Sequence, residues 1–239
     1  MLHKTAIVTG AGKGIGKELA LRLASIGYNV VLAARNKAEI SAVATLCEKQ
    51  NVKALPVVTD VTNEENVKIL FALAEANFDT VDLLVNDAGM GIFKPLAETS
   101  LEEWNKVVNT NLTGAFLCAR EAFKRMKKQQ GGTIVNIASV VGITGYANQG
   151  AYTASKHGMV GLTKVLAEEG RAYKIKAHVI CPGGVATEMV RKSRPDLNPE
   201  EIIQPCDVAD LLEYLVKLPP RVTVDLVHLR RYQSASFVV

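Results

Sequence analysis

Short runs of Val, Ile, Leu and Ala alternate along this chain with longer segments whose apolar residues recur at helical spacing. Several of the short runs are apolar without interruption, as expected for strands that are buried on both faces. This alternation predicts a doubly wound α/β fold, in which a parallel sheet carries helices on both faces. The expected strands are Lys4–Thr9, Asn29–Ala33, Val52–Val58, Val81–Val85, Thr133–Ala138, Ile175–Cys181 and Val222–Leu229. The expected helices are Gly14–Ile26, Lys37–Gln50, Asn63–Ala76, Leu101–Lys128, Ala151–Arg171 and Val208–Lys217.

The length and composition fit one large domain. The chain has 239 residues, of which 48% are hydrophobic and 22% charged, and this is enough for a sizeable core. No linker-like, repeated or low-complexity segment interrupts it, so residues 1–239 are expected to form a single domain. The net charge of +4 is small and the basic residues are scattered, which argues against a nucleic-acid partner.

The four cysteines each lie in or beside an apolar segment. They form no CxxC pair and no Cys/His cluster with zinc spacing, so we expect buried free thiols and no metal site. Free thiols fit a reducing compartment. The N-terminal residues lack the features of a signal peptide, and no apolar run approaches the ~20 residues of a membrane helix. We therefore expect a cytoplasmic protein without a membrane partner. The cysteines are Cys47, Cys118, Cys181 and Cys206.

A glycine-rich turn joins the first expected strand to the first expected helix. It reads Thr9-Gly10-Ala11-Gly12-Lys13-Gly14-Ile15-Gly16. Glycines allow the backbone to approach a diphosphate closely, and the following helix N-terminus offers free N–H groups to the phosphates. The spacing is GxxxGxG rather than the more common GxGxxG. The turn therefore predicts a dinucleotide site; the alternative is a glycine turn that binds nothing.

The end of the second expected strand indicates which dinucleotide binds. NAD sites usually have an acidic residue there, about 20 residues beyond the glycines, which holds the ribose hydroxyls. This chain has Ala34-Arg35-Asn36 instead, with no acid. Arg35 can bind a 2′-phosphate through two hydrogen bonds, and Lys13 can add a second positive charge. We therefore expect NADP(H) to be preferred over NAD(H), the alternative being that both residues are solvated surface charges.

Tyr152 and Lys156 lie four residues apart in YTASK, on one face of an expected helix. A tyrosine has a reference pKa of ~10, and a neighbouring ammonium group favours its ionised form. Such a pair can exchange a proton with a carbonyl oxygen while a hydride reaches the carbon. Ser139 follows an expected strand and can donate a hydrogen bond to the same oxygen. A YxxxK pair alone is weak evidence, since most such pairs lie on a helix surface.

Taken together, these motifs resemble those of the short-chain dehydrogenases/reductases. The TGxxxGIG turn, Asn86-Asp87-Ala88-Gly89, Ser139, the YxxxK helix and Pro182-Gly183 occur in the order and spacing of that family. The resemblance covers roughly residues 4–229. It implies a Rossmann-like, seven-stranded parallel sheet with strand order 3-2-1-4-5-6-7.

The resemblance also assigns roles to residues. Tyr152 matches the general acid/base, Lys156 the residue that lowers the tyrosine pKa and holds the nicotinamide ribose, and Ser139 the residue that orients the carbonyl. Asn111 matches an asparagine whose helix irregularity supports a proton-relay water. The implied cofactor-binding residues, beside Tyr152 and Lys156, are Gly10, Gly12, Lys13, Gly14, Ile15, Gly16, Arg35, Asp60, Val61, Asn86, Ala88, Gly89, Pro182, Gly183, Val185 and Thr187.

Two departures from the family pattern bear on function. Asp87 stands where the family commonly has a second asparagine. The C-terminus lacks the glycine pair of the 3-oxoacyl-acyl-carrier-protein reductases, and it has Pro219-Pro220-Arg221 before the last expected strand. This ending is more similar to NADP-dependent carbonyl and hydroxy-acid reductases, although the acyl-carrier reductase stays open as an alternative.

We therefore expect an NADP(H)-dependent oxidoreductase that moves a hydride between the nicotinamide and a small carbonyl or secondary-alcohol substrate. A non-catalytic NADP-binding sensor is the alternative from another class, and the Asn111–Ser139–Tyr152–Lys156 set argues against it. A homodimer or homotetramer paired through the long helices is expected. The residues around 188–205 are expected to form the substrate loop, and the sequence does not identify the substrate.

Overall fold

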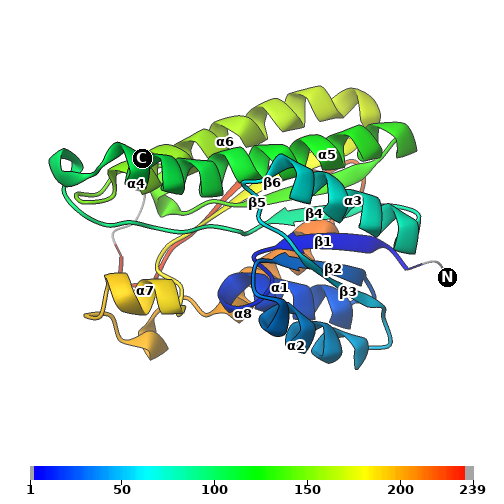
Figure 1. Cartoon of the computed structure of the whole chain (residues 1–239), viewed down its shortest axis with the longest axis horizontal. Coiled ribbons are helices and arrows are strands. Elements are labelled where there is room, and N and C mark those ends of the chain that lie inside the picture. The colour runs from blue at the N-terminus through cyan, green and yellow to red at the C-terminus, as the bar shows by residue number, and fades with distance from the viewer. Residues whose placement is uncertain (1–2, 235–239) are drawn as a thin grey trace.

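The seven strands form one parallel sheet. A computed structural model of the chain describes residues 3–234 and is shown in Figure 1. The strand order is β3-β2-β1-β4-β5-β6-β7, as the family resemblance implied. Strands β1, β4, β5 and β6 occupy the middle of the sheet and are almost entirely buried, which explains why they have few polar side chains. The strands are β1 (Thr5–Thr9), β2 (Asn29–Ala34), β3 (Ala54–Val58), β4 (Leu83–Asn86), β5 (Gly132–Ile137), β6 (Ile175–Pro182) and β7 (Leu226–Leu229).

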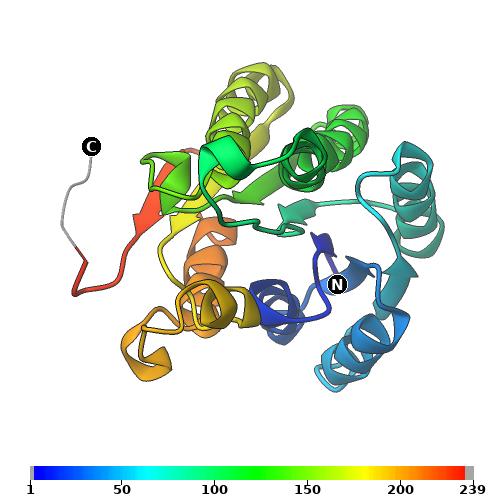
Figure 2. The ribbon, with the colours of Figure 1, turned by 60° about the vertical axis from the view of Figure 1, so that its left-hand side comes forward.

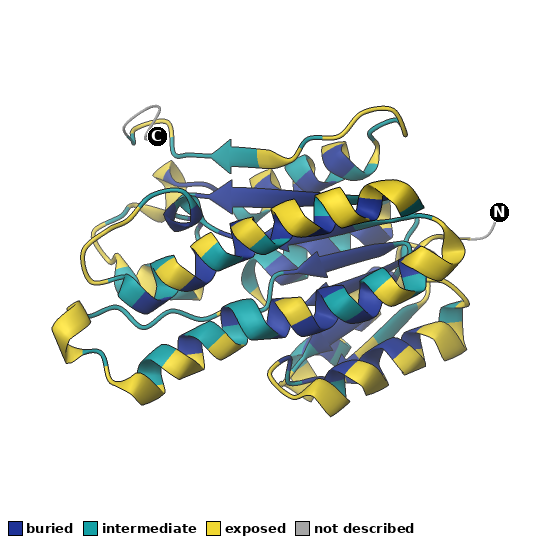
Figure 3. Ribbon diagram, turned by 90° about the horizontal axis from the view of Figure 1, so that it is seen from above, coloured by how far each residue is buried: buried dark blue, intermediate teal, exposed yellow. Residues whose placement is uncertain are grey.

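Helices cover both faces of the sheet. One layer contains α1, α2 and α8, and the other contains α3, α5 and α6 (Figure 1). Figure 3 shows buried strands between helices whose outer faces are exposed, so the core lies in two apolar layers, one on each side of the sheet. The helices are α1 (Gly14–Ser25), α2 (Lys37–Glu48), α3 (Glu64–Phe78), α4 (Leu101–Val108), α5 (Gly114–Gln129), α6 (Gly150–Gly170), α7 (Glu188–Ser193) and α8 (Pro205–Val216).

Side-chain caps determine where several helices begin. The side chain of Asn36 accepts backbone N–H groups at the start of α2, and that of Asn63 does so at the start of α3. Ser100 and Glu103 form a reciprocal capping box at α4. Helix α1 differs, because its N-cap residue Lys13 makes no side-chain capping bond and its first turn contains no acid. The first N–H groups of α1 are therefore left for another partner.

Three expectations about elements were wrong in detail. The helix expected over Leu101–Lys128 is divided into α4 and α5 by a π-helical segment, Asn109–Thr113. The substrate loop expected over 188–205 contains helix α7, which Thr187 caps through the backbone N–H of Val190. The last strand is shorter than expected, since only Leu226–Leu229 pairs with β6. Figures 1 and 2 place α7 beside the end of the layer that contains α1 and α8.

The expectation for the cysteines was wrong at one position. Cys47, Cys118 and Cys181 are buried free thiols, but Cys206 is exposed. Cys206 occupies the first turn of α8. Within residues 3–234, no group of three or more His, Cys, Asp or Glu side chains could hold a metal ion. No helix in that range is long and apolar enough to cross a membrane.

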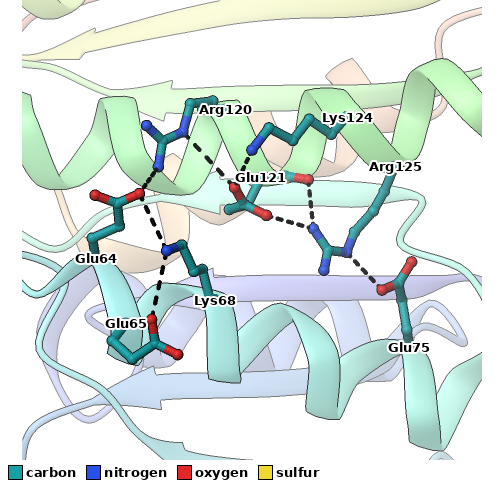
Figure 4. Close-up of polar contacts among 8 residues, drawn as sticks. All are labelled: Glu64, Glu65, Lys68, Glu75, Arg120, Glu121, Lys124 and Arg125. Carbon is teal, nitrogen blue, oxygen red and sulfur yellow. Dashed lines mark hydrogen bonds and ion pairs between the residues drawn. The ribbon is translucent and has the colours of Figure 1, made fainter.

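An ion-pair network joins α3 to α5 on the outside of one helix layer (Figure 4). Glu121 is almost buried and binds Lys124 at 2.7 Å and Arg125 at 2.8 Å. Arg125 also reaches Glu75 on α3 at 2.9 Å and lies over the ring of Phe71. The network therefore ties the two helices together where their apolar faces end.

Candidate active site

A cleft of about 1160 Å³ lies at the carboxyl ends of the strands. Ligands of open α/β sheets bind at this edge, where the loops after neighbouring strands converge. The cleft is lined by most of the residues that the sequence assigned to catalysis and cofactor binding: Gly10, Gly12, Lys13, Gly14, Ile15, Arg35, Asp60, Val61, Ala88, Gly89, Ser139, Tyr152, Lys156, Pro182, Gly183, Val185 and Thr187. Three residues predicted for the site, Gly16, Asn86 and Asn111, lie behind this lining.

The glycine turn requires glycine at Gly10 and Gly14 for its backbone conformation. Their φ angles are +70° and +56°, which L side chains rarely adopt. A Cβ on Gly10 would also lie 2.9 Å from the backbone nitrogen of Ala88. The hydroxyl of Thr9 stabilises this close approach of the two turns, because it accepts the N–H groups of Asp87 and Ala88, each at 3.1 Å. The turn after β1 is therefore held directly against the turn after β4.

Gly16 serves the packing of the first turn of α1. A Cβ there would lie 2.4 Å from the carbonyl oxygen of Gly10 and 2.7 Å from Oδ2 of Asp87. Only glycine lets the helix start this close to the turn. Gly16 thus supports the cleft from behind and does not line it.

The buried side chain of Asn86 makes hydrogen bonds within the protein. Its side chain is buried, and its Nδ2 donates to Oδ1 of Asn136 on β5 at 2.9 Å and to the Ala115 carbonyl at 3.2 Å. Asn136 in turn donates to the hydroxyl of Thr163 on α6 at 2.8 Å. This chain of buried hydrogen bonds fixes the ends of β4 and β5 against the helices.

Asn111 lies fully buried in the π-helical segment. Its Oδ1 accepts the Met90 N–H at 2.8 Å, and its Nδ2 donates to the Met90 carbonyl at 2.9 Å and to the Ser155 hydroxyl at 3.0 Å. Ser155 donates to the carbonyl of Tyr152 at 2.7 Å. Ser155 and Met90 were missed from the sequence; the position of Ser155 next to Lys156 in YTASK was the available signal. Asn111 therefore positions the helix that carries the tyrosine.

Tyr152 and Ser139 form the reactive edge of the cleft. The side chain of Ser139 interacts with the Tyr152 phenol, and the Phe93 ring packs edge-on against Tyr152 with centroids 5.6 Å apart. Burial raises the pKa of Tyr152 to about 12, while the interaction with Ser139 acts in the opposite direction. The expected lowering of this pKa by Lys156 is not found, because burial dominates at the phenol.

Lys156 approaches Tyr152 from one helical turn away, with its ammonium group 5.8 Å from the ring centroid. The side chain is buried and donates to the carbonyl of Ile137 at 2.7 Å. Burial lowers the pKa of Lys156, and the charge of Asp87 partly offsets this. Burial raises the pKa of Asp87, and the charge of Lys156 partly offsets that shift. Asp87 and Lys156 therefore stabilise each other's charged form in the floor of the cleft.

The other end of the cleft contains the two basic residues expected to bind a 2′-phosphate. Arg35 forms no ion pair with any described residue, whereas Lys13 is paired with Glu188 of α7 at 2.8 Å. The hydrogen bond with Glu188 is the main reason that the pKa of Lys13 is raised. A Cβ on Gly12 would lie 2.8 Å from Oε2 of Glu39. Glu39 and Glu188 line the cleft but were not predicted, since both stand outside the motifs that marked the site.

The arrangement fits a nicotinamide dinucleotide. The backbone of the glycine turn lines the cleft, and the N-terminus of α1, which has no side-chain cap, offers N–H groups to a diphosphate. Ser139 follows β5, with Tyr152 and Lys156 on α6, whereas Arg35 follows β2, which β1 and β4 separate from β5, so the reactive groups and Arg35 lie at different ends of the cleft. The cofactor of the family therefore finds donors along the length of the cleft.

Comparison with known proteins identifies the family. Residues 4–198 match the model of the short chain dehydrogenases. This chain belongs to that family of oxidoreductases, which use a nicotinamide cofactor. It is 38% identical over 196 residues to a 3beta-hydroxysteroid dehydrogenase from Mediterraneibacter gnavus, covering 82% of this chain and 71% of that protein. It is 36% identical over 226 residues to a 3-oxoacyl-[acyl-carrier-protein] reductase from Synechocystis sp., covering 90% of each.

Solved structures show the same fold. The crystal structure of levodione reductase matches with a TM-score of 0.88 and 31% identity, over 94% of this chain and 95% of that one. An alcohol dehydrogenase from the archaeon Thermococcus sibiricus, complexed with 5-hydroxy-NADP, matches with a TM-score of 0.89 and 28% identity, over 98% of both chains. The Rossmann-like, seven-stranded parallel fold predicted from the sequence is thus confirmed.

Proposed function

We propose that this protein is an NADP(H)-dependent reductase of a small carbonyl compound, acting reversibly on the corresponding secondary alcohol. The observation that carries the proposal is the gathering of Tyr152, Ser139 and Lys156 at one end of a single cleft whose other end contains Arg35. A protein that only bound the dinucleotide would have no need of Tyr152 as a proton donor. This arrangement favours an enzyme over a sensor.

The residues of this chain divide the chemistry as follows. The nicotinamide supplies the hydride when the cofactor is bound. Tyr152 donates its phenolic proton to the carbonyl oxygen of the substrate, and Ser139 donates a second hydrogen bond to that oxygen. The ammonium group of Lys156 stabilises the phenolate that forms, since opposite charges attract strongly in a site of low dielectric. Asn111 keeps Tyr152 in place through Ser155.

The preference for NADP(H) rests on Arg35 and on the absence of an acid at the end of β2. Within the described residues the guanidinium of Arg35 has no carboxylate partner, so it can pair with a 2′-phosphate without breaking an ion pair. Lys13 must first leave Glu188. We therefore assign Arg35 the larger share of the selection for the 2′-phosphate.

The proposal is tested by following the oxidation of NADPH and NADH with a panel of ketones, diketones, aldehydes and an acetoacetyl thioester. We expect turnover of small carbonyls with NADPH and much slower turnover with NADH. Alcohol oxidation that is far faster with NAD⁺ would refute the proposed cofactor and direction. Tight NADPH binding without turnover of any substrate would favour the sensor.

A second candidate is a 3-oxoacyl-acyl-carrier-protein reductase. It is favoured by the 36% identity to the Synechocystis enzyme over 90% of both chains. The C-terminal departure, with Pro219-Pro220-Arg221 before β7, argues against it. Reduction of the acetoacetyl thioester with little reaction of simple aldehydes or diketones would establish this candidate.

We also propose that the protein forms a dimer or tetramer through α5 and α6. Phe116 on α5 is 42% exposed and Val165 on α6 is 52% exposed, which leaves apolar side chains on the outer faces of these helices. Covering such side chains is favourable. Light scattering is expected to give at least twice the mass of the chain, and a monomer would refute this assembly.

A further inference from the structure

The carboxylate of Asp87 lies at the start of α1. Its Oδ2 lies beside the first turn of the helix, where a Cβ on Gly16 would be 2.7 Å from it. The first turn of α1 has no acid of its own and no side-chain cap. Asp87 therefore brings in a negative charge, from the turn after β4, at the positive end of the helix dipole.

Asp87 also faces the catalytic tyrosine and lysine. The charges of Asp87 and Lys156 influence each other, and the charge of Asp87 raises the pKa of Tyr152. The other groups that face this pair are the hydroxyl of Thr9 on β1 and the buried thiol of Cys181 on β6, which interacts with Lys156. The remaining charged groups of the cleft lie along its length: Lys13, Arg35, Glu39, Asp60, Lys106, Glu188, Arg191 and Lys192.

This position creates a conflict with an anionic cofactor. The diphosphate of a dinucleotide is expected at the same helix N-terminus, because the glycine turn opens there. Two anions would then share one positive helix end. Burial shifts the pKa of Asp87 upward and that of Lys156 downward, and both shifts are toward neutral pH. Uptake of a proton by the pair can therefore reduce the repulsion between Asp87 and the diphosphate near neutral pH.

We propose that Asp87 is a cofactor-site residue whose carboxylate opposes the anionic cofactor at the first turn of α1, so that NADP(H) binds with uptake of a proton by the Asp87–Lys156 pair. The inference rests on the proposed use of NADP(H). It assigns a specific effect to the residue at which this chain departs from the asparagine common in the family.

The net charge of the pair determines the sign of the effect. The pair carries +1 when both groups are protonated, zero when Asp87 has lost its proton, and −1 when Lys156 has also lost its proton. Affinity for a polyanion should therefore fall in two steps as the pH rises, and these steps belong to the pair and not to either residue alone. With asparagine at position 87 the charge falls only from +1 to zero.

The test compares the protein with its Asp87→Asn variant. Asparagine has nearly the same shape as aspartate, so the substitution removes the charge and keeps the packing against Gly16. NADPH affinity is measured by fluorescence from about pH 6 to about pH 9, which spans both steps. We expect equal affinities at the acidic end and about tenfold tighter binding by the variant at the alkaline end, equivalent to one pKa unit of interaction. Calorimetry in two buffers of different ionisation enthalpy should show less proton uptake by the variant.

Controls separate this effect from others. The 2′-phosphate of NADPH titrates identically in both proteins and so cancels in the comparison. The difference in affinity between the two proteins should also be found with NADH, because NADH has the same diphosphate. Glu48→Gln removes an exposed carboxylate on α2 and should leave the pH dependence unchanged. If Asp87→Asn does not fold, as judged by circular dichroism, Asp87→Ser makes the same comparison.

Parallel pH profiles and equal proton uptake for the two proteins would overturn the inference while leaving the proposed function intact. Absence of NADPH and NADH binding by both proteins at every pH would instead overturn the proposed function.

Discussion

The side-chain amide of Asn111 binds both backbone polar groups of Met90. The Oδ1 of Asn111 accepts the Met90 N–H at 2.8 Å, and its Nδ2 donates to the Met90 carbonyl at 2.9 Å. The same amide donates to Ser155, which donates to the carbonyl of Tyr152. One buried side chain in a π-helical segment thus connects the turn after β4 to the helix that carries the proposed proton donor. Its position depends on the irregular helix, since π-helical turns rotate side chains away from the regular α-helical face.

Replacing Asn111 by Ala should therefore impair both stability and turnover. The backbone groups of Met90, in a partly buried place, and the buried hydroxyl of Ser155 would lose their partner, and the free energy of unfolding should fall by about 2–4 kcal/mol. Denaturant unfolding measures this, and kcat should fall more than NADPH affinity does. Asn109→Ala, at an exposed position of the same segment, is the matched control. Normal stability and kcat in Asn111→Ala would contradict the positioning role.

Replacing Tyr152 by Phe should abolish catalysis while preserving the site. The ring and its edge contact with Phe93 remain, but the proton donor is gone, so kcat should fall by at least about 100-fold. NADPH affinity, measured by fluorescence, should change little. The control is Tyr146→Phe, which removes the hydroxyl of an exposed tyrosine. Turnover near that of the unaltered protein would exclude Tyr152 as the acid.

Replacing Arg35 by Ala should weaken NADPH binding about tenfold or more and leave NADH binding almost unchanged. The reason is the loss of a charge-assisted hydrogen bond to the 2′-phosphate. Dissociation constants for both cofactors measure the effect. Arg221→Ala, at an exposed site near the C-terminus, controls for the loss of one positive charge. An equal loss of affinity for NADH and NADPH would show that Arg35 does not bind the 2′-phosphate.

Two glycine-to-alanine substitutions should have opposite effects. A Cβ at Gly16 would lie 2.4 Å from the carbonyl oxygen of Gly10, so Gly16→Ala should displace α1, weaken NADPH binding and lower the melting temperature. A Cβ at Gly161, within α6, meets nothing within 4 Å. Gly161→Ala should stabilise the protein by up to about 1 kcal/mol through helix propensity. Thermal melts of both variants measure this, and equal shifts would refute the close approach at Gly16.

The Glu121 network should make stability fall in acid. Burial alone would raise the pKa of Glu121, but hydrogen bonds from Lys124 and Arg125 outweigh it and leave the pKa below its usual value. The ionised carboxylate of Glu121 therefore stabilises the folded state at pH values above about 4.3, its pKa in the unfolded chain. This contribution is lost as the pH falls through the lowered pKa that Glu121 has in the folded protein.

Glu121→Gln should thus be less stable than the unaltered protein at neutral pH, by about 1–2 kcal/mol, because three cations of the network, Arg120, Lys124 and Arg125, lose a nearly buried partner. The difference should shrink as the pH falls through the lowered pKa of the native carboxyl, because that carboxyl is then protonated as well. Urea unfolding at several pH values measures it. Glu168→Gln, which breaks an exposed pair with Arg171, should have almost no effect. A difference that stays constant with pH would contradict the ionic contribution.

The sequence pattern was sufficient to predict the order of the strands along the chain and most of the helices, and with the family resemblance it named most of the residues that line the cleft. Local signals carry that information: buried strands are apolar, helices show their periodicity, and Gly10 and Gly14 mark a turn whose conformation other residues rarely adopt. The motifs around Ser139, Tyr152 and Lys156 act within one helix or at one strand end. Their proximity therefore follows once a parallel sheet is assumed.

The tertiary structure decided what depends on contacts between distant segments. The side chain of Asn86 turns to Asn136 on the neighbouring strand, Lys13 pairs with Glu188, and Asp87 meets both the first turn of α1 and Lys156. The pKa of Tyr152 is likewise set by burial, which no local pattern records. Hydrogen bonds, ion pairs and desolvation depend on separation in space. Only the folded chain brings these partners, which lie far apart in the sequence, within reach of one another.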